Sequence, residues 1–184
     1  MRIIGGTFRG RTLTTGRGLA IRPATDRARQ TIFDILTHRM SFEGLSVLDL
    51  FSGTGSFGLE SLSRGAAHAT FVDSSRASMD VLQANIRALQ CQDRCTVYQS
   101  DVFRFLKSVG RPYDLIFADP PYGLPDLAKI PEAIEGSRVL RAGSSVIMEH
   151  PTSLPIVLPS DRYSVTTRQF GQTMVLIAEF NASS

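Results

Sequence analysis

Four consecutive residues, Asp119-Pro120-Pro121-Tyr122, carry the most specific chemical signal in the sequence. The two prolines fix φ and remove two backbone donors, so the neighbouring carbonyl groups are held rigidly and stay free to accept hydrogen bonds. A carboxylate, a carbonyl and an aromatic ring together suit a planar base with an exocyclic amino group. The acceptors would steer the amine lone pair towards an electrophile and stabilise the positive charge on the attacking nitrogen. The alternative is a purely structural role, in which a Pro-Pro turn simply ends a strand.

A second stretch, residues 47–58 (VLDLFSGTGSFG), could bind a cofactor. An apolar run carrying Asp49 leads into Gly53, Gly55 and Gly58, and such glycines allow a sharp turn and the close approach of a ligand. Their spacing also fits the GxGxxG fingerprint of dinucleotide sites. An acid inside the strand favours a site that orients a cationic sulfonium and an amino-acid group, although Asp49 could instead cap a neighbouring loop. This stretch alone is therefore compatible with two cofactors, a nicotinamide dinucleotide or S-adenosylmethionine.

Short β-prone runs alternate with amphipathic segments along the rest of the chain. This alternation predicts an α/β fold with a doubly wound, mostly parallel, Rossmann-like sheet. The last two β-rich runs, around residues 169–172, predict a terminal antiparallel hairpin. The expected strands are 47–50, 69–73, 96–99, 113–118, 144–149, 163–168 and 173–180, and the expected helices are 25–40, 56–64, 75–90, 102–109 and part of 126–140.

Two further acids follow predicted strands, and ligands bind beyond the carboxyl ends of strands in such sheets. Asp73 stands 18 residues past Gly55, where an acid can accept both ribose hydroxyls of either cofactor. Asp101 stands where an adenine amino group could donate to it, with a backbone N–H from Val102 beside it. We therefore expect the glycine loop, these acids and residues 119–122 to share one edge of the sheet.

Positive charge is concentrated at the start of the chain. Residues 1–39 hold eight arginines against Asp26 and Asp34, a net charge of +6, whereas the other 145 residues hold 12 basic and 15 acidic ones. This asymmetry predicts a polyanionic partner, and arginine suits bidentate contacts to phosphate and guanine. A lysine-poor genome composition could explain the choice of arginine but not its position.

The first residues are too few to bury a core alone. We expect residues 1–23 to form a basic arm with a small hairpin, pairing Ile3-Ile4 with Thr12-Leu13, and residues 24–184 to form one domain. Arg27 and Arg29 fall in the first turn of the expected helix, where positive charge opposes the helix dipole. They are then either solvated or held there for a ligand.

Composition narrows the remaining possibilities. The chain has 184 residues, 42% of them hydrophobic and 20% charged, as in ordinary globular proteins. No run approaches the length of a membrane span, and the first residues lack the apolar segment of a secretory signal, so we expect a cytoplasmic monomer. Cys91 and Cys95 are expected to be reduced, and the scattered histidines predict no metal site.

The combination of DLFSGTGSFG, Asp73, Asp101 and DPPY resembles class I S-adenosylmethionine-dependent methyltransferases that act on an exocyclic amine. The opening RIIGGTFRGR, with Arg22-Pro23 and residues 25–27 (TDR), resembles the RsmD family in particular. That family methylates N2 of a guanine in bacterial small-subunit (16S) ribosomal RNA. The resemblance covers nearly the whole chain and implies ribosomal RNA, or an assembly intermediate of the small subunit, as the partner.

The resemblance also assigns roles to residues. The arm would lie on RNA, with some arginines near the entrance of the site. Departures from the family pattern at Ala24, Gln30, Asp34 and in the glycine loop affect helix and loop packing rather than the acceptors. By resemblance, the cofactor would be lined by Asp49, Phe51, Gly53, Gly55, Asp73, Asp101 and Val102, the target base by Asp119, Pro120, Pro121 and Tyr122, and the RNA by Arg9, Arg11, Arg22 and Arg27.

Three other functions would each account for only part of these features. An amino-methyltransferase acting on adenine or cytosine of other RNA or DNA shares the DPPY motif, but 184 residues leave little room for a segment that reads DNA sequence. An NAD-dependent oxidoreductase gives DPPY no role. A non-catalytic RNA-binding module would not need intact acceptors and a glycine loop.

Overall fold

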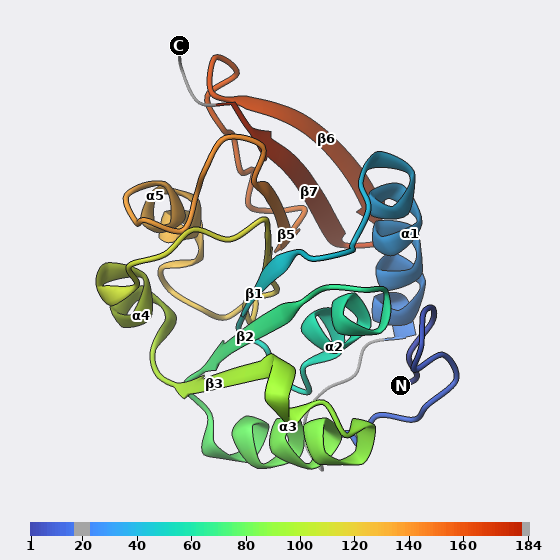
Figure 1. The fold of residues 1–184 in the computed structure, drawn as a ribbon. Helices are drawn as coiled ribbons and strands as arrows, with labels where there is room; N and C mark the ends of the chain where they lie inside the picture. The colour runs from blue at the N-terminus through green and yellow to red at the C-terminus, as the bar shows by residue number, and fades with distance from the viewer. Residues whose placement is uncertain (17–22, 182–184) are drawn as a thin grey trace.

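A seven-stranded sheet forms the centre of the molecule (Figure 1). The computed structural model describes residues 1–16 and 23–181. The strands are β1 (Ser46–Leu50), β2 (His68–Asp73), β3 (Cys95–Gln99), β4 (Leu115–Ala118), β5 (Ser145–Pro151), β6 (Tyr163–Phe170) and β7 (Thr173–Phe180). Their order is β3-β2-β1-β4-β5-β7-β6, with β1 to β5 parallel and β7 antiparallel to both of its neighbours. The predicted fold class, including the terminal hairpin, is confirmed.

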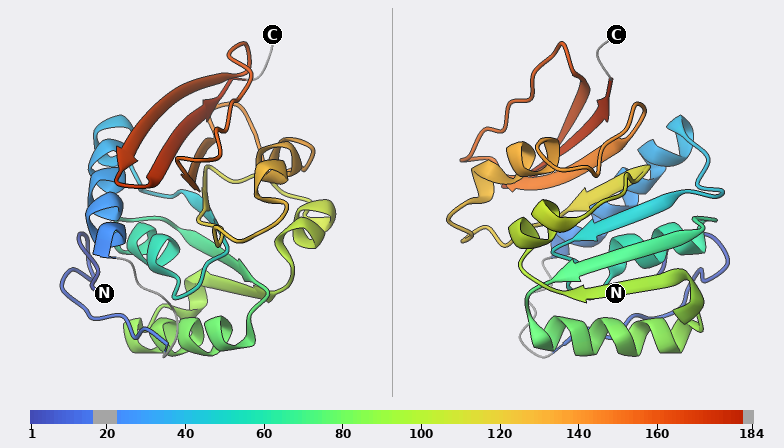
Figure 2. Two further views of the ribbon diagram at one scale, coloured as in Figure 1. Left: turned by 180° about the vertical axis from the view of Figure 1, so that it is seen from behind. Right: turned by 60° about the vertical axis from the view of Figure 1, so that its left-hand side comes forward.

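Helices cover both faces of this sheet, as the views in Figure 2 show. The helices are α1 (Pro23–Arg39), α2 (Ser56–Ser63), α3 (Arg76–Leu89), α4 (Val102–Ser108) and α5 (Ile130–Glu135), with 3₁₀ turns at Gln92–Arg94 and Leu127–Lys129. The first three pack on one face, where Phe57 of α2 stacks on Phe117 of β4 with ring centroids 4.8 Å apart. The last two cover the opposite face. The helix expected within residues 126–140 is thus only six residues long, preceded by the second 3₁₀ turn.

The start of the chain turns back on itself as predicted, but it pairs through one bridge at Arg2 and Thr12 rather than through Ile3-Ile4, and it is packed onto the domain. Ile3 and Leu13 are buried in the same core as α1 and α2. The backbone of Gly6 approaches α2 so closely that a Cβ atom there would lie 1.7 Å from the carbonyl oxygen of Ser63. Only glycine fits this position.

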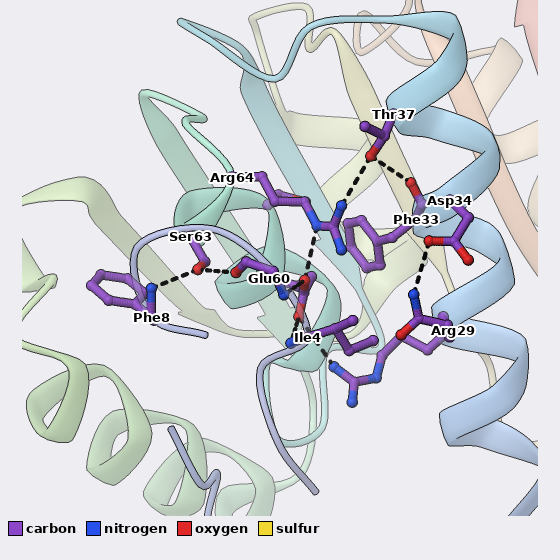
Figure 3. A network of polar contacts seen from close by, with 12 residues as sticks. Ile4, Phe8, Arg29, Phe33, Asp34, Thr37, Glu60, Ser63 and Arg64 are labelled. Carbon is purple, nitrogen blue, oxygen red and sulfur yellow. Dashed lines mark hydrogen bonds and ion pairs between the residues drawn. The ribbon is translucent and has the colours of Figure 1, made fainter. Parts of the chain in front are cut away.

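A buried carboxylate, Glu60 of α2, joins the hairpin to the helices (Figure 3). It has no exposed surface and accepts backbone hydrogen bonds from Ile4 (2.7 Å) and Gly5 (2.8 Å). Two arginines also reach it: the Nε atom of Arg64 at 2.8 Å and Nη1 of Arg29 at 3.6 Å. A buried charge is tolerated only when it is paired in this way.

The burial of Arg29 corrects the sequence-based expectation. The helix begins at Pro23, two residues before the predicted start, so Arg29 falls in its second turn and faces the core at 2% exposure. Besides Glu60 it reaches the carbonyl oxygen of Arg2, at 2.7 Å. This arginine is therefore part of the structural framework, whereas Arg27 remains exposed.

Replacing Glu60 by Gln should lower the free energy of unfolding by about 3–5 kcal/mol, because the change leaves a buried arginine charge without its counter-charge. Urea denaturation measures the effect. The matched control is Asp80→Asn, which breaks the exposed Arg76–Asp80 pair and should cost less than about 1 kcal/mol. A loss for Glu60→Gln no larger than that of the control would contradict this account of the hairpin.

Candidate active site

Three carboxylates converge at the carboxyl edge of the sheet. Asp49 of β1 stands in register with Phe71 of β2 and Phe117 of β4. Asp73 and Asp119 each lie two residues beyond those partners, and side chains of alternate residues share a face of a sheet. All three acids therefore point to the face covered by α2. The sequence-based prediction that these strand ends meet at one edge is confirmed by the strand order.

Asp49 is the most deeply buried of the three, at 2% exposure. Burial raises its pKa well above the ordinary value of 3.8; the hydrogen bond from the Gly58 N–H lowers it, and the charges of Asp119 and Asp73 raise it further. The Gly58 N–H lies 2.9 Å from Oδ2. Asp49 thus ties the first turn of α2 to β1, so its bond goes to a helix and not to a loop, as the alternative considered from the sequence had it.

The glycine loop between β1 and α2 has a left-handed backbone at Phe51, Gly53 and Gly55. A Cβ atom on Gly55 would lie 2.3 Å from Cδ1 of Leu82, so this glycine lets the loop lie against α3. At Gly53 the nearest atom to an added Cβ is the Phe51 carbonyl oxygen at 3.9 Å, so its surroundings are open. A ligand can therefore approach the backbone at Gly53.

Asp73 fixes the loop from the end of β2. One carboxylate oxygen accepts from the Gly53 N–H at 2.9 Å and the other from the Ser75 N–H at 2.8 Å. Each oxygen of a carboxylate has about two acceptor sites, and Asp73 is half-buried. Both oxygens therefore keep the capacity to accept a ribose hydroxyl, which fits the predicted adenosyl cofactor.

Asp101 and Val102 stand at the start of α4. The Asp101 carboxylate caps this helix by accepting from the Arg104 N–H at 2.9 Å, and it borders a hollow of about 620 Å³ between α4 and α5. Val102 is buried, and as the first residue of the helix its N–H has no intrahelical partner. The pair lies beside the third strand, at the same edge as Asp73.

The DPPY turn follows β4 directly, on the other side of β1. Pro120 is buried, Pro121 is exposed, and Asp119 and Tyr122 are half-buried. The Tyr122 hydroxyl donates a hydrogen bond of 2.6 Å to Oγ1 of Thr173, the first residue of β7. This bond joins the Tyr122 ring to the start of β7, next to the edge where the three acids lie.

Two residues at this edge were missed by the sequence reasoning. Glu149 of β5 is buried at 2% exposure. It lies two residues after Ile147, so its side chain is on the same face of the sheet as Asp119. An acid ending an apolar strand was a readable signal, as it was for Asp73. Thr173 carried no comparable signal, since only the long-range pairing of β7 with β5 brings it there.

Two of the predicted RNA-binding arginines, Arg9 and Arg11, do not join the strand-end site. Arg9, Arg11 and Arg27 are exposed, and Arg22 lies outside the described residues. The Arg11 guanidinium donates to the carbonyl oxygen of Ala88, in the last turn of α3. Because α3 starts beside Asp73 and its 14 residues span about 20 Å, the hairpin tip lies towards the opposite edge of the sheet, as Figure 1 shows.

Across residues 1–16 and 23–181, no group of three or more His, Cys, Asp or Glu side chains is placed to hold a metal ion. Cys91 and Cys95 are free thiols with their Sγ atoms 3.9 Å apart. None of the described helices has both the length and the apolar character needed to span a bilayer.

Comparisons with known proteins identify the relatives of this chain. The family model described as Conserved hypothetical protein 95 matches residues 1–179. Ribosomal RNA small subunit methyltransferase D of Escherichia coli (strain K12) is 39% identical over 122 residues, 66% of this chain and 60% of that protein. The solved structure of Escherichia coli yhhF, named as a candidate methyltransferase, has a TM-score of 0.87 and 31% identity, covering 100% of this chain and 99% of that chain. A more distant chain solved with S-adenosylhomocysteine shares the fold, with a TM-score of 0.68 at 17% identity over 86% of this chain and 50% of that chain.

Replacing Asp49 by Asn should change how stability depends on pH. The folded state holds the Asp49 proton more tightly than the unfolded chain, so the contribution of Asp49 to the free energy of unfolding falls as pH rises from about 3.8 through its raised pKa. The Asn variant lacks this contribution and should gain stability relative to wild type towards neutral pH.

Urea denaturation between pH 4 and pH 8 measures this change, and Asp161→Asn, at an exposed position in a loop, is the control. An Asp49→Asn variant whose stability follows the same pH curve as the wild type would show that Asp49 does not carry the electrostatic cost assigned to it.

Proposed function

The chain belongs to the RsmD family, and from this premise we propose that it transfers a methyl group from S-adenosylmethionine to the exocyclic N2 of a guanine in 16S ribosomal RNA. The observation that carries the proposal is that Asp49 and Asp73 lie close to Asp119, the first residue of the DPPY turn. A site with this much negative charge suits a cationic ligand and a reaction in which positive charge develops. The glycine loop and the half-buried Asp73 support an adenosyl group beside them.

Each cofactor-facing residue has a distinct part in the proposal. The bound cofactor supplies an electrophilic methyl group on a sulfonium. Asp73 accepts the ribose hydroxyls, Asp101 accepts the adenine amino group, and the Val102 N–H donates to the adenine ring. The amino-acid end of the cofactor would lie against Phe51 and the accessible backbone of Gly53.

The DPPY turn holds the target base. The Asp119 carboxylate and a proline carbonyl accept the two hydrogens of the guanine amino group and turn its lone pair towards the methyl group. Tyr122 stacks on the base, an interaction worth about 1–3 kcal/mol. As the N–C bond forms, the C–S bond would break with its electron pair left on the sulfur; the Asp119 carboxylate would stabilise the positive charge growing on the nitrogen until the nitrogen loses a proton to solvent. The remaining catalytic effect comes from holding the reacting atoms in line.

The basic arm, residues 1–23, would hold RNA at a distance from the reacting base. Arg11 binds the far end of α3, about 20 Å from the strand ends, and the backbone of Arg9 bonds to Gly6, which packs on the last residue of α2. Both therefore suit phosphates flanking the target rather than the target nucleotide. Arg22 and Arg27 would contact RNA nearer the entrance. The proposed substrate is ribosomal RNA or an assembly intermediate of the small subunit, met in the cytoplasm by a monomer.

Replacing Asp119 by Ala should lower kcat for methyl transfer by at least about 100-fold, because the acceptor that orients the amine and stabilises its charge is lost. Affinity for S-adenosylhomocysteine, measured by calorimetry, should stay nearly unchanged. Asp73→Ala is the matched control and should do the reverse, weakening the cofactor more than it slows the chemistry at saturation. Equal losses of turnover and cofactor affinity in Asp119→Ala would contradict the role proposed for the DPPY acid.

Replacing Arg9 by Gln should weaken RNA binding and reduce the slope of log K against log salt by about 0.7–0.9, the value of one phosphate contact. Arg9 is preferred to Arg11 because Arg11 also binds α3. Filter binding to a 16S rRNA transcript at several salt concentrations measures the slope, with Arg76→Gln on the exposed surface of α3 as the control. A slope that matches wild type would remove the hairpin tip from the RNA-binding surface.

A further inference from the structure

The C-terminal hairpin reaches the catalytic edge because of its direction in the sheet. Strand β7 runs antiparallel to β5, which is the parallel neighbour of β4. The first residue of β7, Thr173, is in register with Pro151, the last residue of β5, and so lies three positions beyond the level at which β4 ends. An antiparallel strand thus places its start, rather than its end, beside the DPPY turn.

Thr173 is held firmly at this position. It is 8% exposed and pairs with Phe170 across the tight β6–β7 turn. The turn is itself fixed to the segment after β5, because the Thr152 N–H donates to the Gln172 carbonyl oxygen at 3.0 Å. The Thr173 hydroxyl is consequently a fixed acceptor rather than one that moves with a free loop.

Tyr122 is held at both ends as a result. Its backbone follows two prolines of fixed φ, and its hydroxyl donates to Oγ1 of Thr173 at 2.6 Å. A ring that is held only through its Cα can swing about the Cα–Cβ bond, whereas a hydrogen bond at the hydroxyl holds the far end of the ring and so fixes where the ring lies. The position of this ring decides where a stacked base lies relative to the methyl donor.

We propose that Thr173 is a positioning residue for the target base, acting through the Tyr122 hydroxyl, so that the C-terminal hairpin is part of the substrate site. The inference deepens the proposed function and rests on it for the identity of the base. RNA affinity comes chiefly from phosphate contacts, so loss of the Thr173 hydroxyl affects turnover more than RNA binding.

Four variants test the coupling: Thr173→Val, Thr173→Ser, Tyr122→Phe and the double variant of Thr173→Val with Tyr122→Phe. Thr173→Val keeps the shape of the side chain and removes the acceptor, and Tyr122→Phe removes the same hydrogen bond from its other side. The probe is an unmodified 16S rRNA transcript, free or reconstituted into small subunits. Thr167→Val, at an exposed position on β6, is the control.

Loss of one hydrogen bond predicts that Thr173→Val lowers kcat about 3- to 10-fold, with KM for RNA and affinity for S-adenosylhomocysteine within about twofold of wild type. Thr173→Ser should retain activity within about twofold. In the Tyr122→Phe background, Thr173→Val should cost less than about 1.5-fold, because the two residues act through one bond. Effects that multiply in the double variant, or full activity of Thr173→Val, would overturn the proposal, as would a loss of thermal stability that accounts for the loss of turnover.

A second readout is independent of methyl transfer. The chain has four tyrosines, so labelling tyrosine with ¹³C at Cζ gives few signals, and Tyr122→Phe identifies the one from Tyr122. Thr173→Val should shift that signal, while Thr173→Ser and Thr167→Val should leave it in place. If wild-type protein transfers no methyl group to ribosomal RNA, the proposed function fails while this shift still tests the coupling. An unmoved signal in Thr173→Val overturns the inference whatever the RNA result.

Discussion

The buried carboxylate of Asp49 is the constraint on which the site depends. It lies inside an apolar strand, two other acids flank it on the same face of the sheet, and one backbone N–H of α2 is bonded to it. Such an arrangement costs stability, because like charges in a medium of low dielectric constant repel one another. In the proposed reaction, a cationic cofactor and an amine that becomes positively charged would both relieve this repulsion. The electrostatic cost to the fold would then favour cofactor binding and the transition state.

Helix α2 connects this site to the beginning of the chain. Its Gly58 N–H holds Asp49, and Glu60, two residues later, holds the N-terminal hairpin and two arginines. One short helix therefore holds both the strand that leads into the glycine loop and the N-terminal hairpin. The two acids differ in their surroundings: Glu60 is paired with two arginines and two backbone donors, whereas Asp49, within the described part of the chain, has acidic neighbours and one backbone donor at hydrogen-bond distance.

Much of this arrangement could be predicted from local patterns, and the rest could not for identifiable reasons. The strand alternation, the glycine loop and the strand-end acids are local signals, and the strand order and register bring Asp49, Asp73 and Asp119 together as expected. Spacing alone could not show that Arg29 is buried against Glu60 while Arg27 is exposed, because that depends on which face of α1 meets α2. Nor could it place Arg11 against the far end of α3 or Thr173 beside Tyr122, since both contacts join residues more than 50 positions apart.

The most direct test is to supply labelled S-adenosylmethionine to the protein with unmodified 16S rRNA, 23S rRNA, small subunits and DNA, and to identify the modified nucleoside by mass spectrometry. The account predicts label in 16S rRNA, alone or within the small subunit, recovered as N2-methylguanosine at one position. Label recovered in adenine, in cytosine or only in the other nucleic acids would contradict the assignment of the base and substrate. Binding of a nicotinamide dinucleotide without binding of S-adenosylmethionine would contradict the assignment of the cofactor.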